Sequence, residues 1–286
     1  PPTLISLGLE WYIEGDDDRD AMVEVAYRKS GERRWNEGLP LIRVQNERSV
    51  YDQTLDYTAP NMFAGSIFYL EPDTDYDVQL TMTDPDGVIG RAERTVTMHT
   101  RAEPEAFSGG RVFHVYPMDH TGPEEQPAFH GLVGAYYMAG LGGDWSRASA
   151  PRVRAGDTLL VHAGVYQEFN RRSYTHEIDS GYTTCCGTTW DGTYYLTADG
   201  TEEMPITIKA AGDGEVIFDG ADNYVLFNMM GGDWHLFEGI TFRNTSIAIE
   251  AGIKGITGAE GIMVKNSRFE DVSTAIHSDW SGSNKF

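Results

Sequence analysis

The chain reads Leu236-Phe-Glu-Gly-Ile-Thr-Phe-Arg-Asn-Thr-Ser-Ile-Ala-Ile-Glu250 and, 27 positions later, Met263-Val-Lys-Asn-Ser-Arg-Phe-Glu-Asp-Val-Ser-Thr-Ala-Ile-His277. Phe242 corresponds to Phe269 in this repeat, and Ile249 corresponds to Ile276. The apolar residues of both copies alternate or form short runs, which is the spacing of strands. A period of this length is typical of a β-solenoid, in which each coil buries its apolar face against the next coil.

The repeat also predicts which side chains face one another. In parallel coils, equivalent residues of neighbouring strands lie about 4.8 Å apart. Three pairs of opposite charge are then neighbours: Glu238 with Lys265, Arg243 with Glu270, and Glu250 with His277. Such pairs stabilise a sheet by a few tenths to about 1 kcal/mol. Asn244 above Asp271 predicts a turn ladder, whose side chains bond to the backbone of a bend.

This part of the chain resembles the right-handed parallel β-helix of pectate-lyase-like proteins. Residues 155–166 and 205–220 are similar to earlier coils of that family, so the resemblance covers residues 111–286. It implies a capping helix at about 127–141, which would cover the first coil. Residues 167–204 interrupt the coil spacing and are interpreted as an insertion. Long loops of this kind are often functional.

Residues 1–103 predict a β-sandwich, because several short alternating strands are separated by turns such as Asp84-Pro-Asp-Gly87. This segment is similar to the fibronectin type III domain. Leu70-x-Pro72-x-Thr74-x-Tyr76 matches that family's tyrosine corner, where the phenol bonds to the backbone, and Trp11 matches its core tryptophan. Residues 104–110 form the expected linker. The predicted fold class is all-β, a sandwich followed by a parallel β-helix.

Composition limits the partners. The net charge of −22 argues against nucleic acid, since neutralising phosphates requires basic patches. The sequence contains no run of about 18 apolar residues, so it predicts no membrane-spanning helix. The chain begins Pro-Pro, which suggests a processed or trimmed start, and it ends at Phe286 without a cap for the last coil. We therefore expect missing carboxy-terminal coils or a further chain at that end. The expected location is secreted or at the cell surface.

The family resemblance implies a carbohydrate-active protein. The leading hypothesis is a lyase that cleaves an anionic polysaccharide by β-elimination, which requires a base and a group that neutralises the substrate carboxylate. The catalytic candidates on the solenoid are Lys265, Arg268 and His277. The insertion supplies the candidates for substrate binding: Arg171, Arg172, His176, Tyr182, Trp190 and Tyr194. Its aromatic residues could equally pack the loop onto the flank of the β-helix.

Two other functions stay open. One is a non-catalytic glycan-binding, adhesive or structural surface protein. In such a protein, the charged side chains that face outward would only pair with one another between neighbouring strands. A glycoside hydrolase would need two converging carboxylates, for which Glu270, Asp271 and Asp279 are the candidates.

No cofactor is assigned from the sequence. The run Gly15-Asp-Asp-Asp-Arg-Asp20 lacks a recognised calcium loop and is interpreted as a solvated turn, with calcium as the alternative. No spacing of histidine and cysteine indicates another metal site. The neighbouring Cys185 and Cys186 either form a vicinal disulfide or stay reduced.

Overall fold

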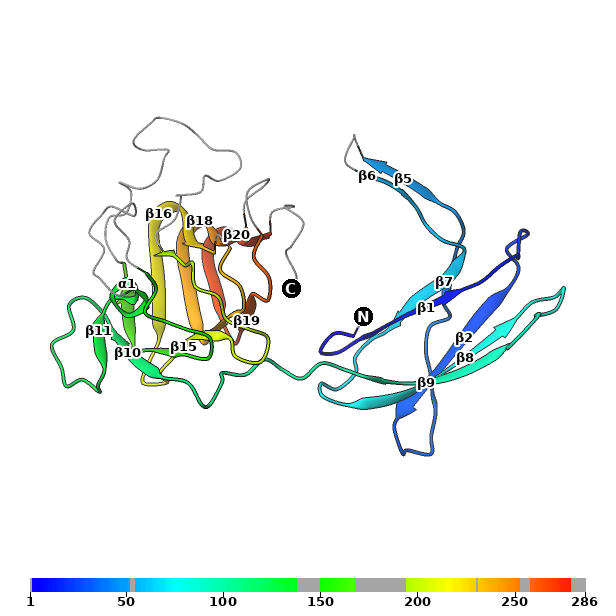
Figure 1. Ribbon diagram of the computed structural model, residues 1–286, viewed down its shortest axis with the longest axis horizontal. Coiled ribbons are helices and arrows are strands. Elements are labelled where there is room, and N and C mark those ends of the chain that lie inside the picture. The colour runs from blue at the N-terminus through cyan, green and yellow to red at the C-terminus, as the bar shows by residue number, and fades with distance from the viewer. Residues whose placement is uncertain are drawn as a thin grey trace. The chain divides into compact units, whose positions relative to one another are not determined.

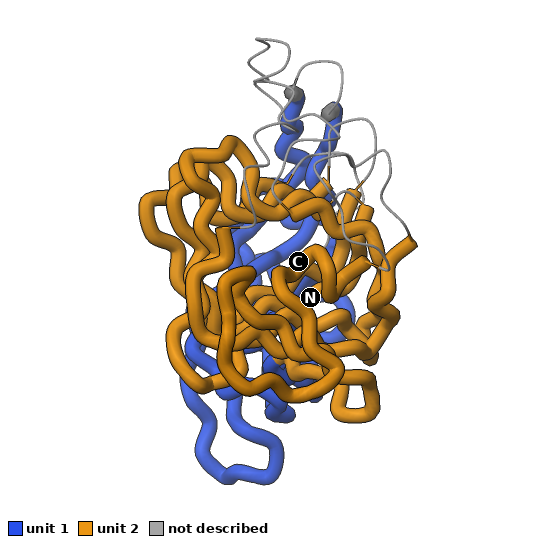
Figure 2. The backbone as a smooth tube through the Cα atoms, turned by 90° about the vertical axis from the view of Figure 1, so that its left-hand side faces the viewer, with its two compact units in different colours: residues 1–103 blue, residues 104–286 orange. Residues whose placement is uncertain are grey.

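The computed structural model describes residues 2–51, 55–137, 150–167, 194–229, 231–252 and 258–278. The chain divides into two compact units, Pro1–Glu103 and Pro104–Phe286 (Figure 2). Within the described ranges the regular structure is β, apart from one short helix. No helix in these ranges has the length and apolar character needed to cross a membrane.

The first unit consists of small antiparallel sheets (Figure 1). Their strand orders are β1-β7-β4, β3-β2-β8-β9 and β5-β6. The strands are β1 (Leu7–Tyr12), β2 (Met22–Lys29), β3 (Asn36–Glu37), β4 (Ile42–Val44), β5 (Arg48–Tyr51), β6 (Leu55–Thr58), β7 (Met62–Ile67), β8 (Asp75–Thr83) and β9 (Glu93–His99).

The two larger sheets of the first unit share one core. Strand β8 buries every second residue, from Tyr76 to Met82, and Trp11 of β1 lies in the same cluster. This alternation is the period-2 pattern of a strand with one covered face. The Tyr76 hydroxyl accepts a hydrogen bond from the Glu71 backbone N–H at 2.9 Å, so the bond predicted for the tyrosine corner is confirmed.

The second unit is built from parallel sheets with stacked strands (Figure 1). One sheet has the order β11-β10-β12-β15-β17-β19, and the other has the order β13-β16-β18-β20, with β14 also paired to β16. The strands are β10 (Val112–Tyr116), β11 (Ala128–His130), β12 (Thr158–Val161), β13 (Gly164–Tyr166), β14 (Tyr194–Tyr195), β15 (Ile206–Ala210), β16 (Val216–Asn228), β17 (His235–Glu238), β18 (Ile240–Ala251), β19 (Met263–Lys265) and β20 (Arg268–Ser278).

The chain passes from one parallel sheet to the other and back, which is a β-helix-like arrangement. Phe242 pairs with Phe269 and Ile249 with Ile276, so the predicted 27-residue register is confirmed. The rings of Phe242 and Phe269 stack with centroids 5.0 Å apart. The core is therefore a column of side chains contributed by successive coils.

The long strands of the second sheet bend at left-handed residues. Asn244 and Asp271 have φ angles of 52° and 50°, which Asn and Asp tolerate better than most residues. The bend of β16 is longer, because three residues separate Asp219 from Asn223 where one separates Arg243 from Thr245. The predicted turn position is thus confirmed. The Asn244 side chain, however, donates to the Asp219 carboxylate at 3.0 Å rather than to a backbone carbonyl.

The strands that flank the predicted insertion, β13 and β14, both pair with β16. Tyr166 of β13 pairs with Phe218 of β16, ahead of the bend, and Tyr194 of β14 pairs with Phe227, beyond it. Both tyrosine rings also contact Phe218 in the core. Residues 194 and 195 therefore already belong to the stack, although the coil spacing predicts an insertion that extends to residue 204.

The predicted capping helix is corrected by the structure. Within the described part of the predicted range, 127–137, Leu132–Tyr136 form the helix α1, and residues 128–130 form the edge strand β11 beside β10; residues 138–141 lie outside the described residues. Gly131, with φ of 81°, separates the two elements. The apolar spacing is helical only from Leu132 onward, and the residues before it gain backbone hydrogen bonds by extending the sheet. No capping helix is shown within the described residues.

Helix α1 brings a buried polar pair into the core. The Tyr136 hydroxyl lies 3.1 Å from Nε2 of His235 and accepts the Ala198 backbone N–H at 2.9 Å. His235 Nδ1 lies 3.0 Å from the Asp233 carbonyl oxygen, which can only accept. The imidazole therefore carries its proton on Nδ1 and accepts from the tyrosine on Nε2. All three polar groups are satisfied while the histidine is neutral.

Candidate functional site

The structure separates the three predicted catalytic residues. Lys265 ends β19 in one sheet, and Arg268 begins β20 in the other. His277 lies near the far end of β20, beyond the bend at Asp271. Arg171, Arg172, His176, Tyr182, Trp190, Cys185 and Cys186 lie outside the described residues.

His277 pairs with a buried carboxylate. Its Nδ1 lies 2.9 Å from Oε1 of Glu250, the residue directly beside it on β18, so the predicted pair is confirmed. The Glu250 side chain is 1% exposed and that of His277 is 42% exposed. A carboxylate bound to one imidazole nitrogen fixes the tautomer and directs the other nitrogen outward. Within the described part of the chain, Nε2 of His277 has no hydrogen-bond partner.

A row of polar residues continues from this pair across the second parallel sheet. Tyr195, Asn228, Glu250 and His277 are register partners on four successive strands. Asn228 is fully buried, as is Glu250. Parallel strands are spaced about 4.8 Å apart, so the hydrogen-bonding groups of this row follow one another at that interval along the stack.

Lys265 and Arg268 are engaged in other contacts. Lys265 Nζ donates to the Pro104 carbonyl at 3.3 Å, while its register partner Glu238 forms an ion pair with Lys209 at 3.1 Å. Arg268 lies 3.3 Å from Glu270 and 3.7 Å from Glu215. These are mostly exposed ion pairs, which contribute little to stability.

Arg243 is the register partner of Glu270, as predicted, but its guanidinium bonds to Asp219. Its Nε and Nη2 donate to Oδ2 of Asp219 at 3.0 and 2.8 Å. Burial alone would raise the pKa of Asp219, but the bonds from Ala221 N–H, Arg243 and Asn244 outweigh it and hold the pKa below its usual value. Asp219 thus connects the bend of β16 to Arg243 and Asn244 on β18, the neighbouring strand.

Of the carboxylates proposed for hydrolase chemistry, the two that belong to the described residues, Glu270 and Asp271, have separate roles. Glu270 contacts Arg268, and Asp271 occupies the left-handed position of the bend. Asp279 lies outside the described residues.

Tyr194 lies in the core of the second unit. It is fully buried, and its ring stacks on Phe227 with centroids 4.7 Å apart. Its hydroxyl donates to the Tyr166 carbonyl at 3.3 Å. This is the packing role that the sequence left open beside sugar binding.

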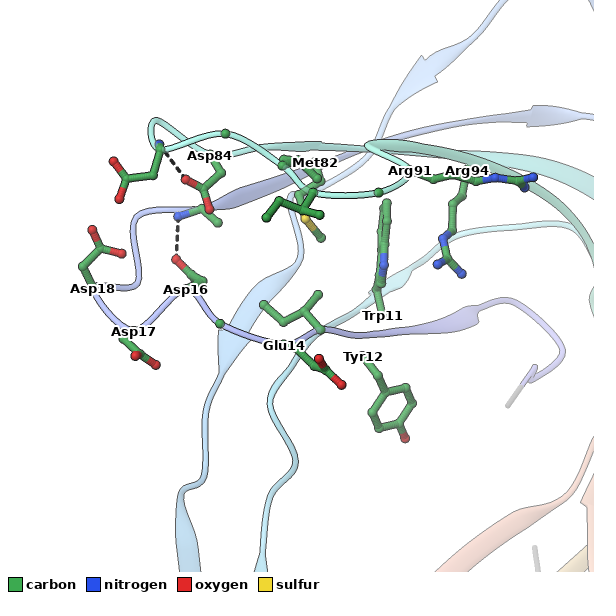
Figure 3. Close-up of a pocket in the computed structure, with 18 residues that line it drawn as sticks. Trp11, Tyr12, Glu14, Asp16, Asp17, Asp18, Met82, Asp84, Arg91 and Arg94 are labelled. Carbon is green, nitrogen blue, oxygen red and sulfur yellow. Dashed lines mark hydrogen bonds between the residues drawn. The ribbon is translucent and has the colours of Figure 1, made fainter.

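The first unit contains an acidic cavity of about 810 Å³ between the turn after β1 and the turn between β8 and β9. Figure 3 shows Asp16, Asp17, Asp18 and Asp84 at one end, with Arg91 and Arg94 beyond Trp11. Carboxylate oxygens of Asp16, Asp20 and Asp84 lie within 4.8 Å of one another, the only such group in the described ranges.

The charges of this acidic group are not equivalent. Burial disfavours the Asp16 carboxylate, but Arg43 and backbone N–H groups outweigh this effect and lower its pKa. The pKa of Asp20 is raised by desolvation and by Asp18 and Asp84. Calcium takes six to eight oxygen ligands, whereas Asp16 is already bound to Arg43. We therefore assign no metal to this group.

Sequence reasoning missed several of these arrangements. It identified Glu250 only as a charged neighbour, because burial of a carboxylate leaves no trace in a local pattern. Asp84 meets Asp16 because the end of β8 pairs with the start of β2, where Thr83 faces Met22. A sandwich topology with β2 and β8 adjacent would have predicted this contact.

Comparisons of the whole chain with protein-family models, with curated proteins and with solved structures find no match. Function must therefore be argued from the geometry of the sites themselves.

Proposed function

We propose that this chain is a secreted or cell-surface carbohydrate-active protein that cleaves an anionic polysaccharide by β-elimination. The observation that supports this most directly is the pair of buried Glu250 and partly exposed His277. A histidine oriented by a carboxylate on one nitrogen can act as a general base through the other. The parallel stack supports a finer fold proposal, a right-handed β-helix, and the Tyr76 bond supports a fibronectin type III fold for the first unit.

In the proposed reaction, Nε2 of His277 takes the proton from the carbon next to the uronate carboxylate. The electrons of that C–H bond form the new carbon–carbon double bond, and the neighbouring C–O bond breaks with its electron pair on the leaving oxygen. That oxygen then receives a proton, from water or from the imidazolium. Glu250 stabilises the positive charge that His277 gains.

The test is product formation from pectate, alginate or a glycosaminoglycan, followed by the ultraviolet absorbance of the unsaturated uronate. His277→Gln should lower the rate by about 10²–10⁴-fold, the usual contribution of a general base. His99→Gln, at an exposed histidine of the first unit, is the matched control and should keep the wild-type rate. Equal rates for wild type and His277→Gln would remove His277 from the proposal, and no product from any anionic polymer would end it.

A non-catalytic surface protein is the second candidate. The paired charges Lys209–Glu238 and Arg243–Asp219 on the outer faces favour it, since these groups are already satisfied. Binding of a polysaccharide without formation of product would select this function.

A further inference from the structure

Strand β9 is the longest free edge among the antiparallel sheets of the first unit. It pairs with β8 along its whole length and ends the order β3-β2-β8-β9, so within the described ranges no strand lies on its other side. Six of its seven residues are exposed. Edge strands offer unpaired backbone groups to other strands, and proteins often protect them with proline, lysine or a bulge. β9 reads Glu93-Arg-Thr-Val-Thr-Met-His99 and has none of the three.

The ladder between β8 and β9 determines which backbone groups of β9 point to the free edge. The Met82 N–H donates to the Ala92 carbonyl at 2.7 Å, and the Thr100 N–H donates to the Thr74 carbonyl at 3.0 Å. Positions 92 and 100 therefore face β8. Such positions alternate in an antiparallel pair, and the register between them has no shift, so positions 94, 96 and 98 also face β8. The N–H and C=O groups of positions 93, 95, 97 and 99 point to the free edge.

The sequence of β9 is complementary to itself when a second copy runs antiparallel beside it. A two-fold axis at Val96 pairs all seven residues, and the free backbone groups of the two strands then face one another. Glu93 lies opposite His99 of the second copy, and Thr95 lies opposite Thr97. Pairs of opposite charge and pairs of threonines are among the cross-strand combinations that stabilise antiparallel sheets.

Charge distinguishes β9 from β1, the other long free edge of this unit. Pro2 already bridges to Leu7 at one end of β1. A two-fold axis farther along that strand, at Glu10, would set two carboxylates of like charge opposite each other, which is destabilising. In β9 the facing charges are opposite. Bonds from the neighbouring aspartates Asp75 and Asp73 raise the pKa of His99 and so favour its charged form.

The same axis joins the apolar faces of the two sheets. Val96 is the register partner of Val78, which is fully buried in the core. Val96 itself is 41% exposed, and on the axis it would meet Val96 of the second copy, which removes apolar surface from water. Arg94, the charged residue on this face, lies over the Trp11 ring at 5.0 Å and would face Met98 of the second copy. No like charges meet on this face.

We propose that the free edge of β9 is a dimer interface, to which β9 of a second copy of this chain adds as an antiparallel strand about a two-fold axis at Val96. The two sheets, each of four strands, then become one continuous sheet.

The first experiment uses the 286-residue protein. Sedimentation of a dilution series should show a monomer of 31.8 kDa in equilibrium with a species of twice that mass. Residue-resolved amide hydrogen exchange should then separate the two sets of backbone groups. The N–H groups of Thr95 and Thr97 should be protected only where the dimer is populated, whereas those of Val96 and Met98, which face β8, should be protected at every concentration.

Substitutions at the axis test the register. Val96→Lys and Val96→Glu each set two like charges opposite one another, so each variant alone should lose the dimer. An equal mixture of the two variants should recover it, because opposite charges then face each other at the axis. Glu10→Lys, on the free edge of β1, is the matched control and should dimerise like wild type.

A wild type that stays monomeric, or a dimer in which the amides of Thr95 and Thr97 exchange as fast as in the monomer, would overturn the proposal. A dimer that persists in both single variants, or a mixture of the two that stays monomeric, would overturn it as well. If the Val96 variants do not fold, the mass and the exchange pattern of the wild type decide.

Discussion

Acid should destabilise the parallel-sheet unit through one buried imidazole, that of His235. Burial lowers its pKa from the ordinary 6.5 to about 4. Both ring nitrogens are already used by the neutral form, since Nδ1 donates to the Asp233 carbonyl and Nε2 accepts from Tyr136. Charging Nε2 would place a second donor against the tyrosine hydroxyl, with no compensating negative charge at that atom.

Proton linkage gives the sign and the size of the change in the free energy of unfolding with pH. The folded-state pKa lies below the unfolded value, so the unfolded state binds more protons between about pH 4 and pH 6.5. The stabilisation is fully present above pH 6.5 and is lost as the pH falls toward 4. Each pKa unit corresponds to 1.36 kcal/mol, which gives a total loss of about 3 kcal/mol and about 2 kcal/mol between pH 7 and pH 5.

The assay compares urea unfolding of the second unit at pH 7 and pH 5 in wild type and in His235→Phe, which removes the ionisable group. The variant loses hydrogen bonds at both pH values, so the change of its free energy of unfolding with pH is the informative quantity. This change should be smaller than in wild type by about 2 kcal/mol.

His99→Gln, in the exposed part of the first unit, is the control and should change nothing in this transition. Equal pH dependence in wild type and His235→Phe would refute the reasoning. If His235→Phe does not fold, the imidazole signal of His235 in wild type should stay in its neutral position down to about pH 4.

Three further outcomes can be checked by denaturation. Phe242→Ala should cost about 3–5 kcal/mol, because its ring is fully buried between coils, whereas Val165→Ala at an exposed site should cost under about 0.5 kcal/mol. Tyr76→Phe should destabilise the first unit by about 1–2 kcal/mol through loss of the bond from Glu71 N–H. Asp219→Asn should cost about 1–3 kcal/mol at neutral pH; since the pKa of Asp219 is lowered in the fold, the wild-type advantage should fade as the pH drops below the ordinary Asp range. If Phe242→Ala, Tyr76→Phe or Asp219→Asn unfolds like wild type at neutral pH, the contact assigned to that residue is contradicted.

The sequence predicted the second unit best where neighbouring coils have bends of equal length. β18 and β20 stay 27 residues apart along their whole length, so the repeat was visible. From β16 to β18 the separation changes from 24 residues at Asp219 to 22 at Asn223, and no constant period marks that pair. The capping helix was predicted wrongly because residues 128–130 gain more as an edge strand than their local spacing suggests.

The candidate sites were predicted only in part. The Glu250–His277 pair followed from the repeat, because both residues lie inside it. By contrast, Nδ1 of His114 lies 3.0 Å from Nε2 of His162 because β10 pairs with β12, and these two strands share no repeated sequence. Contacts that rest on strand register without sequence similarity become visible only when the backbone is known.

The unequal bends of β16 and β18 have a consequence for how this protein can change. The side chains of β16 and β18 stay in register on both sides of the bend, although the bend, or corner, of β16 is two residues longer than that of β18. The peptide between Tyr166 and Tyr194 also departs and rejoins on either side of that same corner. Length can therefore be added at a corner without disturbing the packed column, which makes the corners natural points for grafting new recognition segments onto an unchanged frame.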